Sequence, residues 1–333
     1  MNGPEFSPLK DPFGRVHDYL RISLTDTCNL RCFYCMPDEQ MQFMPSSHLM
    51  TADEIEAIAQ TFVQYGVKKI RLTGGEPLVR KDAKDVLHRL SKLPVELTLT
   101  TNGVFLNNYL EDLQQCGVRS LNISLDTLHP EKFKRITGRD RFQTVWQNIE
   151  SLLSTSMHVK LNVVAIGGVN DDEIIDFVSL TQKLPLHVRF IEFMPFTGNN
   201  WMSGKVLSMD EMLLNIESHF EIEPLENQIH DTAKKFRVPG HLGTFAFIST
   251  MSSPFCAGCN RLRLTADGKM KNCLFSKGEA DLLGALRSGK KLDDLIQLNL
   301  KDKSWERGGQ IPALFEQTDT EVLVNRSMIS IGG

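Results

Sequence analysis

The chain has 333 residues, of which 41% are hydrophobic and 23% charged, and its formal net charge is −4. This composition is ordinary for a folded globular protein, so it excludes a collagenous or wholly disordered chain. No apolar run approaches the roughly 20 residues of a membrane-spanning helix, and a slightly acidic chain is unlike most nucleic acid-binding proteins. We therefore expect neither a membrane nor a nucleic acid among the partners.

The cysteines suggest a reducing compartment. Six of the seven fall in two tight groups, and only Cys116 stands apart. An odd number in a chain of this length argues against a disulfide framework. The first twenty residues mix acidic and basic side chains and lack the apolar stretch of a signal peptide. We expect a cytoplasmic protein whose clustered cysteines bind metal or carry out redox chemistry.

Between residues 20 and 200, strand-like runs alternate with helix-like stretches. The pattern predicts strands at 20–25, 68–73, 95–100, 120–125, 159–165 and 187–193, and helices near 53–65, 81–92, 107–116, 142–155 and 171–183. Thr51 and Glu54 form a capping box at the start of the first helix. Such alternation favours an α/β fold with parallel strands and outer helices. Six units are too few for a complete eight-stranded barrel, so we expect a partial, open TIM-like barrel, with a doubly wound sheet as the alternative.

Polar residues share one face of five of these strands. Side chains alternate between the two faces of a strand, and the apolar alternate residues lie on the other face. A packed barrel interior would be filled with branched apolar residues. We therefore predict a wide interior that holds a polar, anionic ligand; antiparallel strands with one solvated face are the alternative. The shared polar positions are Arg21 and Ser23, Lys69, Arg71 and Thr73, Thr98 and Thr100, Asn122 and Ser124, and Lys160 and Asn162.

The pattern changes after residue 200. Residues 195–204 are rich in Gly, Asn and Pro and are typical of a linker, and one further helix is predicted near 209–219. We predict two domains, a partial-barrel core over residues 13–200 and a smaller C-terminal domain over residues 201–333. The second cysteine group lies in this smaller domain.

The first cysteine group, Cys28, Cys32 and Cys35, follows the first predicted strand. Thiolates hold iron–sulfur clusters, and three of them leave one iron of a [4Fe–4S] cluster open to a small molecule. A zinc site, with His48 as a fourth ligand, and a redox Cys-x-x-Cys pair are the alternatives.

This group and its surroundings resemble the radical S-adenosylmethionine (SAM) superfamily. The aromatic Tyr34 precedes the third cysteine, and Gly74-Gly75-Glu76-Pro77 follows the second predicted strand, as in that superfamily. The glycines permit close approach of the backbone to a ligand. The resemblance implies that the open iron binds SAM. One electron then cleaves SAM to methionine and a 5′-deoxyadenosyl radical, which abstracts a hydrogen atom from a substrate.

The second group, Cys256, Cys259 and Cys273, again has three members. A second [4Fe–4S] cluster with an open iron is favoured over zinc because of the radical SAM context. In an extended segment, Arg261 and Arg263 between these cysteines point the same way and suit phosphate recognition. A solvated basic strand edge is the alternative.

The combination of both cysteine groups, Arg261-Leu262-Arg263 and a terminal Gly-Gly resembles the GTP 3′,8-cyclase family of molybdenum cofactor biosynthesis, from about residue 13 to the end. The resemblance implies two [4Fe–4S] clusters, SAM as cofactor and GTP as substrate. The radical abstracts the hydrogen at C3′ of the ribose, and the C3′ radical attacks C8 of guanine. Reduction of the resulting aminyl radical, with uptake of a proton, gives (8S)-3′,8-cyclo-7,8-dihydro-GTP. A cyclic pyranopterin monophosphate synthase would consume this product, and a homodimer is possible.

The same resemblance assigns site residues. It implies that the two cysteine groups hold the clusters, and that the open iron of the second meets the guanine. It implies that Gly332 and Gly333 reach into the active site and assist catalysis. It places SAM contacts at Tyr34, Gly75, Ser124 and Met194, and GTP contacts at Arg21, Arg71, Thr100, Lys160, Arg261, Leu262 and Arg263.

Two other functions remain open at this point. A radical SAM peptide maturase with an auxiliary cluster is an enzyme alternative, although such proteins usually carry more C-terminal cysteines. An iron–sulfur electron carrier is a non-enzyme alternative, but a carrier would close both clusters with four ligands and would not need a large cationic interior.

Overall fold

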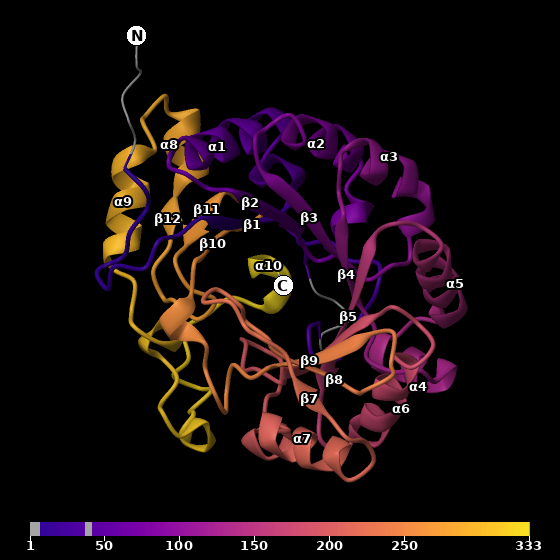
Figure 1. Cartoon of the computed structure of the whole chain (residues 1–333). Coiled ribbons are helices and arrows are strands. Elements are labelled where there is room, and N and C mark those ends of the chain that lie inside the picture. Colours follow the sequence, from indigo (N-terminus) through magenta and orange to yellow (C-terminus); the bar gives the residue numbers. More distant parts are fainter. Residues whose placement is uncertain (1–6, 37–41, 333) are drawn as a thin grey trace.

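The structure, a computed structural model, describes residues 7–36 and 42–332. Its strands form one sheet that curls into a ring, with the helices on the outside (Figure 1). The strands lie in the order β12-β11-β10-β1-β2-β3-β4-β5-β6-β9-β8-β7. Their bounds are β1 Tyr19–Ser23, β2 Lys69–Thr73, β3 Glu96–Thr101, β4 Ser120–Ser124, β5 His158–Ala165, β6 His187–Glu192, β7 Glu223–Pro224, β8 Lys234–Arg237, β9 Thr244–Ile248, β10 Arg261–Leu264, β11 Lys269–Lys271 and β12 Ala280–Asp281.

The parallel part of the sheet runs from β10 through β1 to β6 and on to β9. The strands β1 to β6 follow one another in chain order, without the reversal that a doubly wound sheet requires. The sheet is open, since β12 and β7 are its two edges. The expected open, parallel α/β barrel is therefore confirmed, and both the doubly wound and the antiparallel alternatives are wrong.

Apart from the short C-terminal helix, the helices cover the outer face of the sheet (Figure 1). Helix α1 begins with the predicted capping box, in which the Thr51 hydroxyl accepts from the Glu54 amide and the Glu54 carboxylate accepts from the Thr51 amide. Its buried positions recur at helical spacing and pack toward the core. The bounds are α1 Ala52–Gln64, α2 Ala83–Leu90, α3 Leu110–Gln115, α4 Pro130–Thr137, α5 Phe142–Leu153, α6 Ile174–Leu180, α7 Met209–Glu217, α8 Leu282–Arg287, α9 Asp293–Lys301 and α10 Met328–Ile331.

The C-terminal part of the chain extends the same sheet. Strand β9 pairs with β6 at one end of the first six strands, and β10 pairs with β1 at the other. The six predicted strand–helix units are present, and β9 and β10 add two further parallel strands to the same sheet. The missed strands are flanked by antiparallel β8 and β11 rather than by helices, so no β-α alternation marks them. The division into residues 13–200 and 201–333 stays a prediction.

Residues 195–204, which composition indicates as a linker, also contribute side chains to a buried cluster. Phe196 and Trp201 are buried in a second hydrophobic cluster with Phe275 and Ile331. The Trp201 indole N–H donates to the Phe193 carbonyl (2.9 Å). The segment turns at Thr197 and Gly198, and its two aromatic side chains pack into this cluster.

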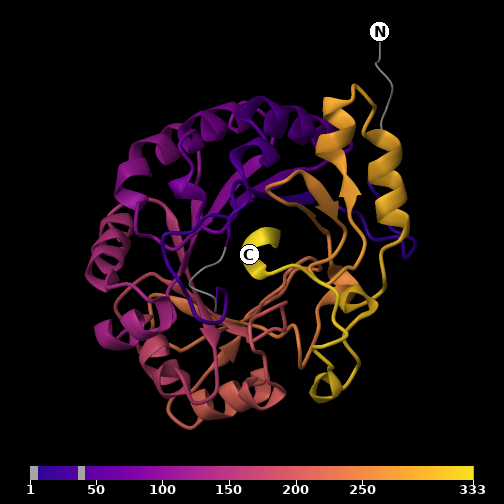
Figure 2. The ribbon, with the colours of Figure 1, turned by 180° about the vertical axis from the view of Figure 1, so that it is seen from behind.

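Two further features bear on the site. Helix α4 lies between β4 and α5, where the sequence analysis predicted one helix rather than two. The short C-terminal helix α10 lies in the middle of the ring in both views (Figures 1 and 2). Within residues 7–36 and 42–332, no helix has the length and apolar character to cross a membrane.

Candidate active site

The first cysteine group lies on the loop after β1. The Cys35 amide donates to the Cys32 carbonyl (2.9 Å), which closes a turn around the last two cysteines. The Arg31 amide donates to the Thr137 carbonyl at the end of α4 (2.8 Å), and its guanidinium donates to the Cys28 carbonyl (2.6 Å). Helix α4, which the sequence analysis missed, therefore holds the loop that carries the three thiols.

Gly74 and Gly75 pack directly against the backbone that precedes Cys28. A Cβ atom on Gly75 would lie 2.5 Å from the Asp26 carbonyl oxygen and 2.6 Å from that of Thr27. One on Gly74 would lie 2.7 Å from the Thr25 carbonyl oxygen. The backbone that approaches these glycines closely is thus that of residues 25–27 and not a ligand. This packing fixes the start of the loop that carries the cysteines.

Glu76 braces the same region from inside the protein. Its buried carboxylate accepts from the amides of Leu78 (3.0 Å) and Asn102 (2.6 Å) and from the Thr101 hydroxyl (2.8 Å). Burial raises the pKa of Glu76 to about 7. The Asn102 side chain lies against the Cys28 sulfur (3.8 Å), so the carboxylate supports the cysteine loop through one intervening residue.

Tyr34 is held by Asp126. The Tyr34 hydroxyl donates to the Asp126 carboxylate (2.5 Å), which also accepts from the Val164 amide (2.9 Å). Burial raises the pKa of Asp126 to about 6. The Tyr34 side chain, which lies between Cys32 and Cys35 in the sequence, is therefore linked through Asp126 to the carboxyl ends of β4 and β5.

A cavity of about 400 Å³ opens within the ring. Its lining includes eight Lys and Arg side chains and a single carboxylate, Asp231. The buried Nε atoms of Arg21 and Arg189 have no hydrogen-bond partner within the part of the chain that the structure describes. Buried cations without a counter-charge are costly, so this cavity fits a polyanionic ligand. The cations are Arg21, Lys69, Arg71, Lys160, Arg189, Arg261, Arg263 and Arg307.

Titration behaviour agrees with this picture. Burial, together with repulsion from Arg189 and Arg71, lowers the pKa of Lys160 to about 8. Burial and Arg71 lower the pKa of Arg189 to about 9, and burial and Arg261 lower that of Arg263 to about 10. An anion in the cavity would favour the charged forms and raise each of these pKa values.

The second cysteine group forms part of the cavity wall. Cys256, Cys259 and Cys273 all line it. Burial alone would raise the pKa of Cys259, but Arg261 and Lys303 lower it to about 6. The Arg261 guanidinium lies 3.7 Å from the Cys259 sulfur, so one thiol of this group ionises readily.

Both groups have the donor chemistry of iron–sulfur ligands. A zinc ion needs ligands that converge on one point, whereas each cysteine of a cluster binds a different iron. Among the described residues, no three His, Cys, Asp or Glu side chains are placed to share one metal ion. Within each group the thiols still lie close enough to raise one another's pKa. Three thiols that lie close together, with no fourth cysteine in the group, fit a cluster with one open iron.

The structure brings most of the predicted GTP contacts together. Thr100 lies at the edge of this set, and its hydroxyl is 3.4 Å from the Arg71 guanidinium. Arg71 also contacts the Tyr19 hydroxyl (2.5 Å). Predicted residues that line the cavity are Arg21, Arg71, Lys160, Met194, Arg261 and Arg263.

Leu262 is placed differently from the expectation. Its side chain is fully buried in the main core, because it alternates with Arg261 and Arg263 along β10. The Leu262 side chain therefore faces away from the cavity, and a GTP contact at this residue would have to come from its backbone. Ser124 is the half-buried last residue of β4, in register with Asn162, which lines the cavity.

The C-terminal tail enters the ring. The Arg263 guanidinium donates to the Gly332 carbonyl (2.7 Å), and Met328 at the start of α10 lines the cavity. A Cβ atom on Gly332 would lie 2.6 Å from the Thr73 hydroxyl oxygen, so only glycine fits there. Gly333 lies outside the described residues.

The sequence analysis missed several residues of this cavity. Arg189 alternates with buried Val188 and Phe190 in β6, so the rule that found Lys160 would also have found it. His230 and Asp231 come from the irregular segment before β8, where no periodicity marks them. Close to the cavity mouth, the His230 ring contacts the Gly258 carbonyl (3.0 Å).

Comparisons with known proteins agree with these features. Residues 22–181 match the model of the Radical SAM superfamily, and residues 186–308 match that of Molybdenum Cofactor Synthesis C. The structure resembles that of Streptococcus suis SuiB bound to precursor peptide SuiA, with a TM-score of 0.63, covering 89% of this chain and 67% of that one. At 16% sequence identity this likeness shows the fold alone.

Closer relatives were found by sequence. The chain is 45% identical to the mitochondrial GTP 3′,8-cyclase of Arabidopsis thaliana, over 100% of this chain and 85% of that protein. It is 43% identical to the GTP 3′,8-cyclase of Peptoclostridium acidaminophilum, over 98% and 99% of the two chains. It spans 46% of the Mus musculus Molybdenum cofactor biosynthesis protein 1, at 49% identity. The chain belongs to the GTP 3′,8-cyclase family within the radical SAM superfamily.

Proposed function

We propose that this chain is a GTP 3′,8-cyclase of molybdenum cofactor biosynthesis, with SAM and two [4Fe–4S] clusters as cofactors. One observation carries the proposal: a cavity lined by eight cationic side chains, two of which have a buried Nε atom without a partner among the described residues, includes one group of three cysteines in its wall and contacts the tail that reaches the other group. This arrangement suits a nucleoside triphosphate that binds in the cavity, with its ribose toward a radical generated at the first cysteine group. Bound SAM and the first cluster supply a 5′-deoxyadenosyl radical for abstraction of the hydrogen at C3′ of GTP.

The first cysteine group and its supports would bind the cofactor. Cys28, Cys32 and Cys35 would hold three irons of the cluster and would leave the fourth iron for SAM. Tyr34 is fixed by Asp126 at the carboxyl ends of β4 and β5, where α/β barrels place their ligands. Gly75, Ser124 and Met194 complete the SAM contacts that we propose.

The cations of the ring would bind the triphosphate. Arg21, Arg71, Lys160, Arg261 and Arg263 come from β1, β2, β5 and β10, so they surround one point from several sides. Guanidinium groups can hold phosphate oxygens bidentately. Thr100 adds a hydroxyl beside Arg71.

The second cysteine group would place the base. Cys256, Cys259 and Cys273 would hold a cluster whose open iron faces the cavity and meets the guanine. The low pKa of Cys259 means that one ligand binds iron without having to lose a proton near neutral pH.

The C-terminal tail would assist the reaction. Gly332 is held by Arg263 inside the ring, and Gly333 follows it. Glycine is narrow enough to pass between β1 and β2 side chains and a bound nucleotide. A chain that lacks Gly332 and Gly333 should bind GTP but turn it over poorly. Full turnover by this shortened chain would show that the tail does not assist the reaction.

The remaining proposals concern the setting of the enzyme. The product would pass to a cyclic pyranopterin monophosphate synthase, and the chain could form a homodimer. All seven cysteines are free, which suits a reducing compartment such as the cytoplasm. We also propose a division at residue 200 into a partial-barrel core and a C-terminal domain, although the two matched families meet earlier, between residues 181 and 186.

Nucleotide dependence tests the proposed function. The clusters would be reconstituted anaerobically, SAM and dithionite added, and 5′-deoxyadenosine measured with GTP, with ATP and without nucleotide. The proposal expects formation of 5′-deoxyadenosine to rise only with GTP, together with a product of the same mass as GTP, because C3′ loses one hydrogen atom and the guanine takes up one electron and one proton. Equal formation in all three reactions would leave a radical SAM enzyme with another substrate, such as a peptide.

A further inference from the structure

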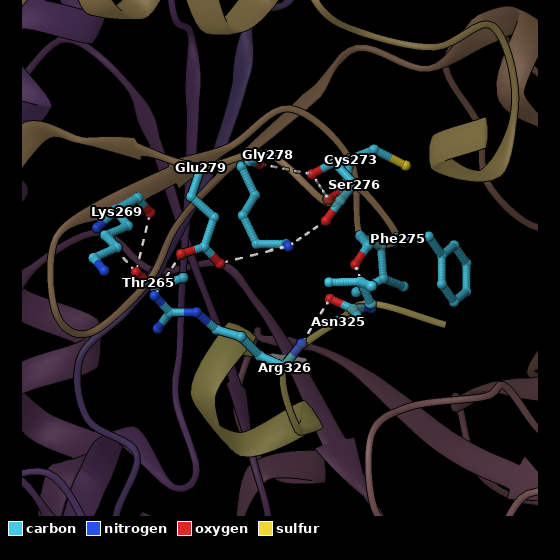
Figure 3. A network of polar contacts seen from close by, with 12 residues as sticks. Thr265, Lys269, Cys273, Phe275, Ser276, Gly278, Glu279, Asn325 and Arg326 are labelled. Carbon is cyan, nitrogen blue, oxygen red and sulfur yellow. Dashed lines mark hydrogen bonds and ion pairs between the residues drawn. The ribbon is translucent and has the colours of Figure 1, made fainter. Parts of the chain in front are cut away.

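The segment that leads into α10 is tied to the barrel by one arginine. The Arg326 guanidinium donates to both oxygens of the Asp267 carboxylate (2.8 and 3.0 Å) and to the Glu279 carboxylate (2.5 Å) (Figure 3). The Arg326 side chain is only 21% exposed, and those of its two partners are 15% and 18% exposed. This is therefore a fixed, largely desolvated contact rather than a mobile surface ion pair.

The contact continues to the second cysteine group. Glu279 also faces the buried Lys271 ammonium (3.6 Å), which donates to the Ser276 carbonyl (2.6 Å). The Ser276 hydroxyl donates to the Cys273 carbonyl (3.0 Å) (Figure 3). A chain of four polar contacts thus runs from Arg326 to a ligand of the proposed second cluster.

A second link from the tail reaches the same loop. The Asn325 side chain donates to the Leu274 carbonyl (3.1 Å), directly after Cys273 (Figure 3). Two consecutive residues of the tail, Asn325 and Arg326, therefore bind the two sides of this loop. The tail and the loop form one unit.

The other end of the tail contacts the first cysteine group and the cavity. The Ile329 backbone hydrogen-bonds the Cys35 thiol, and the Gly332 carbonyl accepts from Arg263 (2.7 Å). Arg326 is six positions before Gly332, and α10 spans most of that interval. A shift of the chain at Arg326 would therefore be carried directly to Gly332.

We propose that Arg326 is a positioning residue, which fixes the register of the C-terminal tail by binding Asp267 and Glu279 and couples the tail to the Cys273 loop. The role of the tail in turnover rests on the proposed function, whereas its placement by Arg326 does not. A planar guanidinium can bind one carboxylate with two parallel hydrogen bonds and a second carboxylate with a third. A lysine ammonium cannot reproduce this geometry.

Hydrogen exchange on the holoenzyme tests the placement. In Arg326→Met, two carboxylates lose their shared donor, so the tail should detach more often. We expect amide exchange across residues 327–332 to accelerate by about tenfold or more, while exchange across β2 stays unchanged. Asp267→Asn, which removes the bidentate acceptor from the opposite side, should accelerate the same peptide. Arg326→Lys should lie between Arg326→Met and the unmodified enzyme.

A matched control separates this effect from the loss of any arginine. Arg287 also binds a carboxylate, that of Glu54, but its side chain is 41% exposed and lies away from the tail. Arg287→Met should leave exchange across residues 327–332 and turnover unchanged. Iron content should remain equal in all variants, which shows that each has folded around both clusters.

Turnover supplies a second readout. In Arg326→Met, turnover of GTP should fall about as far as in the chain without Gly332 and Gly333, and combining both changes should cause no further loss. The dissociation constant of GTP should stay within about twofold, because Arg263 loses a tail contact but keeps its place in the cavity. A misfolded variant would lose binding as well.

Unchanged exchange across residues 327–332 in Arg326→Met would overturn the proposal. A wild-type enzyme that exchanges as expected but does not consume GTP would instead overturn the proposed function. The two failures are therefore distinguishable.

Discussion

The lowered pKa of Lys160 reflects the concentration of positive charge in the cavity when no anion is bound. Burial and neighbouring guanidinium groups hold its pKa at about 8, so a part of its population is neutral just above neutral pH. A bound triphosphate favours the charged form. The folded chain without ligand releases this proton more readily than the unfolded chain, so the stability that Lys160 contributes increases as the pH rises through about 8.

GTP binding should have the opposite pH dependence. As the pH rises from about 7 to about 9, Lys160 loses its proton in the free enzyme and affinity falls, by up to about tenfold per pH unit above its pKa. Lys160→Met should bind GTP more weakly at neutral pH and lack this part of the pH dependence. Equilibrium binding at several pH values measures both. An affinity of the unmodified enzyme that is constant over this range would show that Lys160 does not face the phosphates.

Gly75 is the residue whose size matters most for the first cysteine group. An alanine Cβ would lie 2.5 Å from a backbone oxygen, so the loop leading to Cys28 would have to move. We expect Gly75→Ala to lose the first cluster, with iron falling from about eight to about four per chain. Gly204→Ala is the control, because a Cβ there meets no atom within 4 Å. Full iron content in Gly75→Ala would mean that the loop accommodates the methyl group.

At the scale of elements, buried carboxylates join segments that are far apart in the sequence. The Glu192 carboxylate at the end of β6 accepts from the amides of Met209 (3.0 Å), Met251 (2.7 Å) and Ser252 (2.9 Å). It is fully buried and so fixes the start of α7 against the segment after β9. This one side chain satisfies three backbone donors.

Glu192→Gln should lower stability by about 2 kcal/mol, because the amide group of glutamine faces backbone donors in place of one carboxylate oxygen. Chemical denaturation of the chain measures this change. The exposed Glu221→Gln serves as control and should alter stability by less than about 0.5 kcal/mol. Equal stability of the two variants would contradict this role of Glu192.

The elements that could be predicted are those with strong periodicity. The strands β1 to β6 lie within a residue or two of their predicted positions, because apolar and polar residues alternate along them. The burial pattern of β5, in which every second residue is buried, follows this rule along its whole length. The same alternation identified Arg21, Arg71 and Lys160 as facing the cavity.

Other elements depend on contacts that no local pattern reveals. Strands β9 and β10 are placed by pairing with β6 and β1, which lie far away in the sequence. Leu262 was predicted as a GTP contact because it lies between Arg261 and Arg263 in the same motif. Side chains alternate along β10, so that of Leu262 points toward the core. The network around Arg326 joins residues 267, 279 and 326, and nothing in their spacing indicates it.

At the scale of the whole molecule, the two cysteine groups lie in different surroundings. The first lies beside α10, whereas the second lines the cavity directly. Cys273→Ala should therefore lose about four of about eight irons and retain SAM binding, yet form no cyclised product from GTP. Iron analysis, SAM binding and product detection on the same preparation check the three parts. Normal product formation by this variant would contradict a role of the second group in placing the guanine.

The fate of the hydrogen at C3′ of the ribose tests the central claim most directly. GTP deuterated at C3′ would be incubated anaerobically with the reconstituted enzyme, SAM and dithionite, and 5′-deoxyadenosine would be analysed by mass spectrometry. Deuterium in 5′-deoxyadenosine, formed only with GTP, is the predicted result. Unlabelled 5′-deoxyadenosine formed equally without GTP would contradict the account: the radical SAM core would stand, but GTP would not be its substrate.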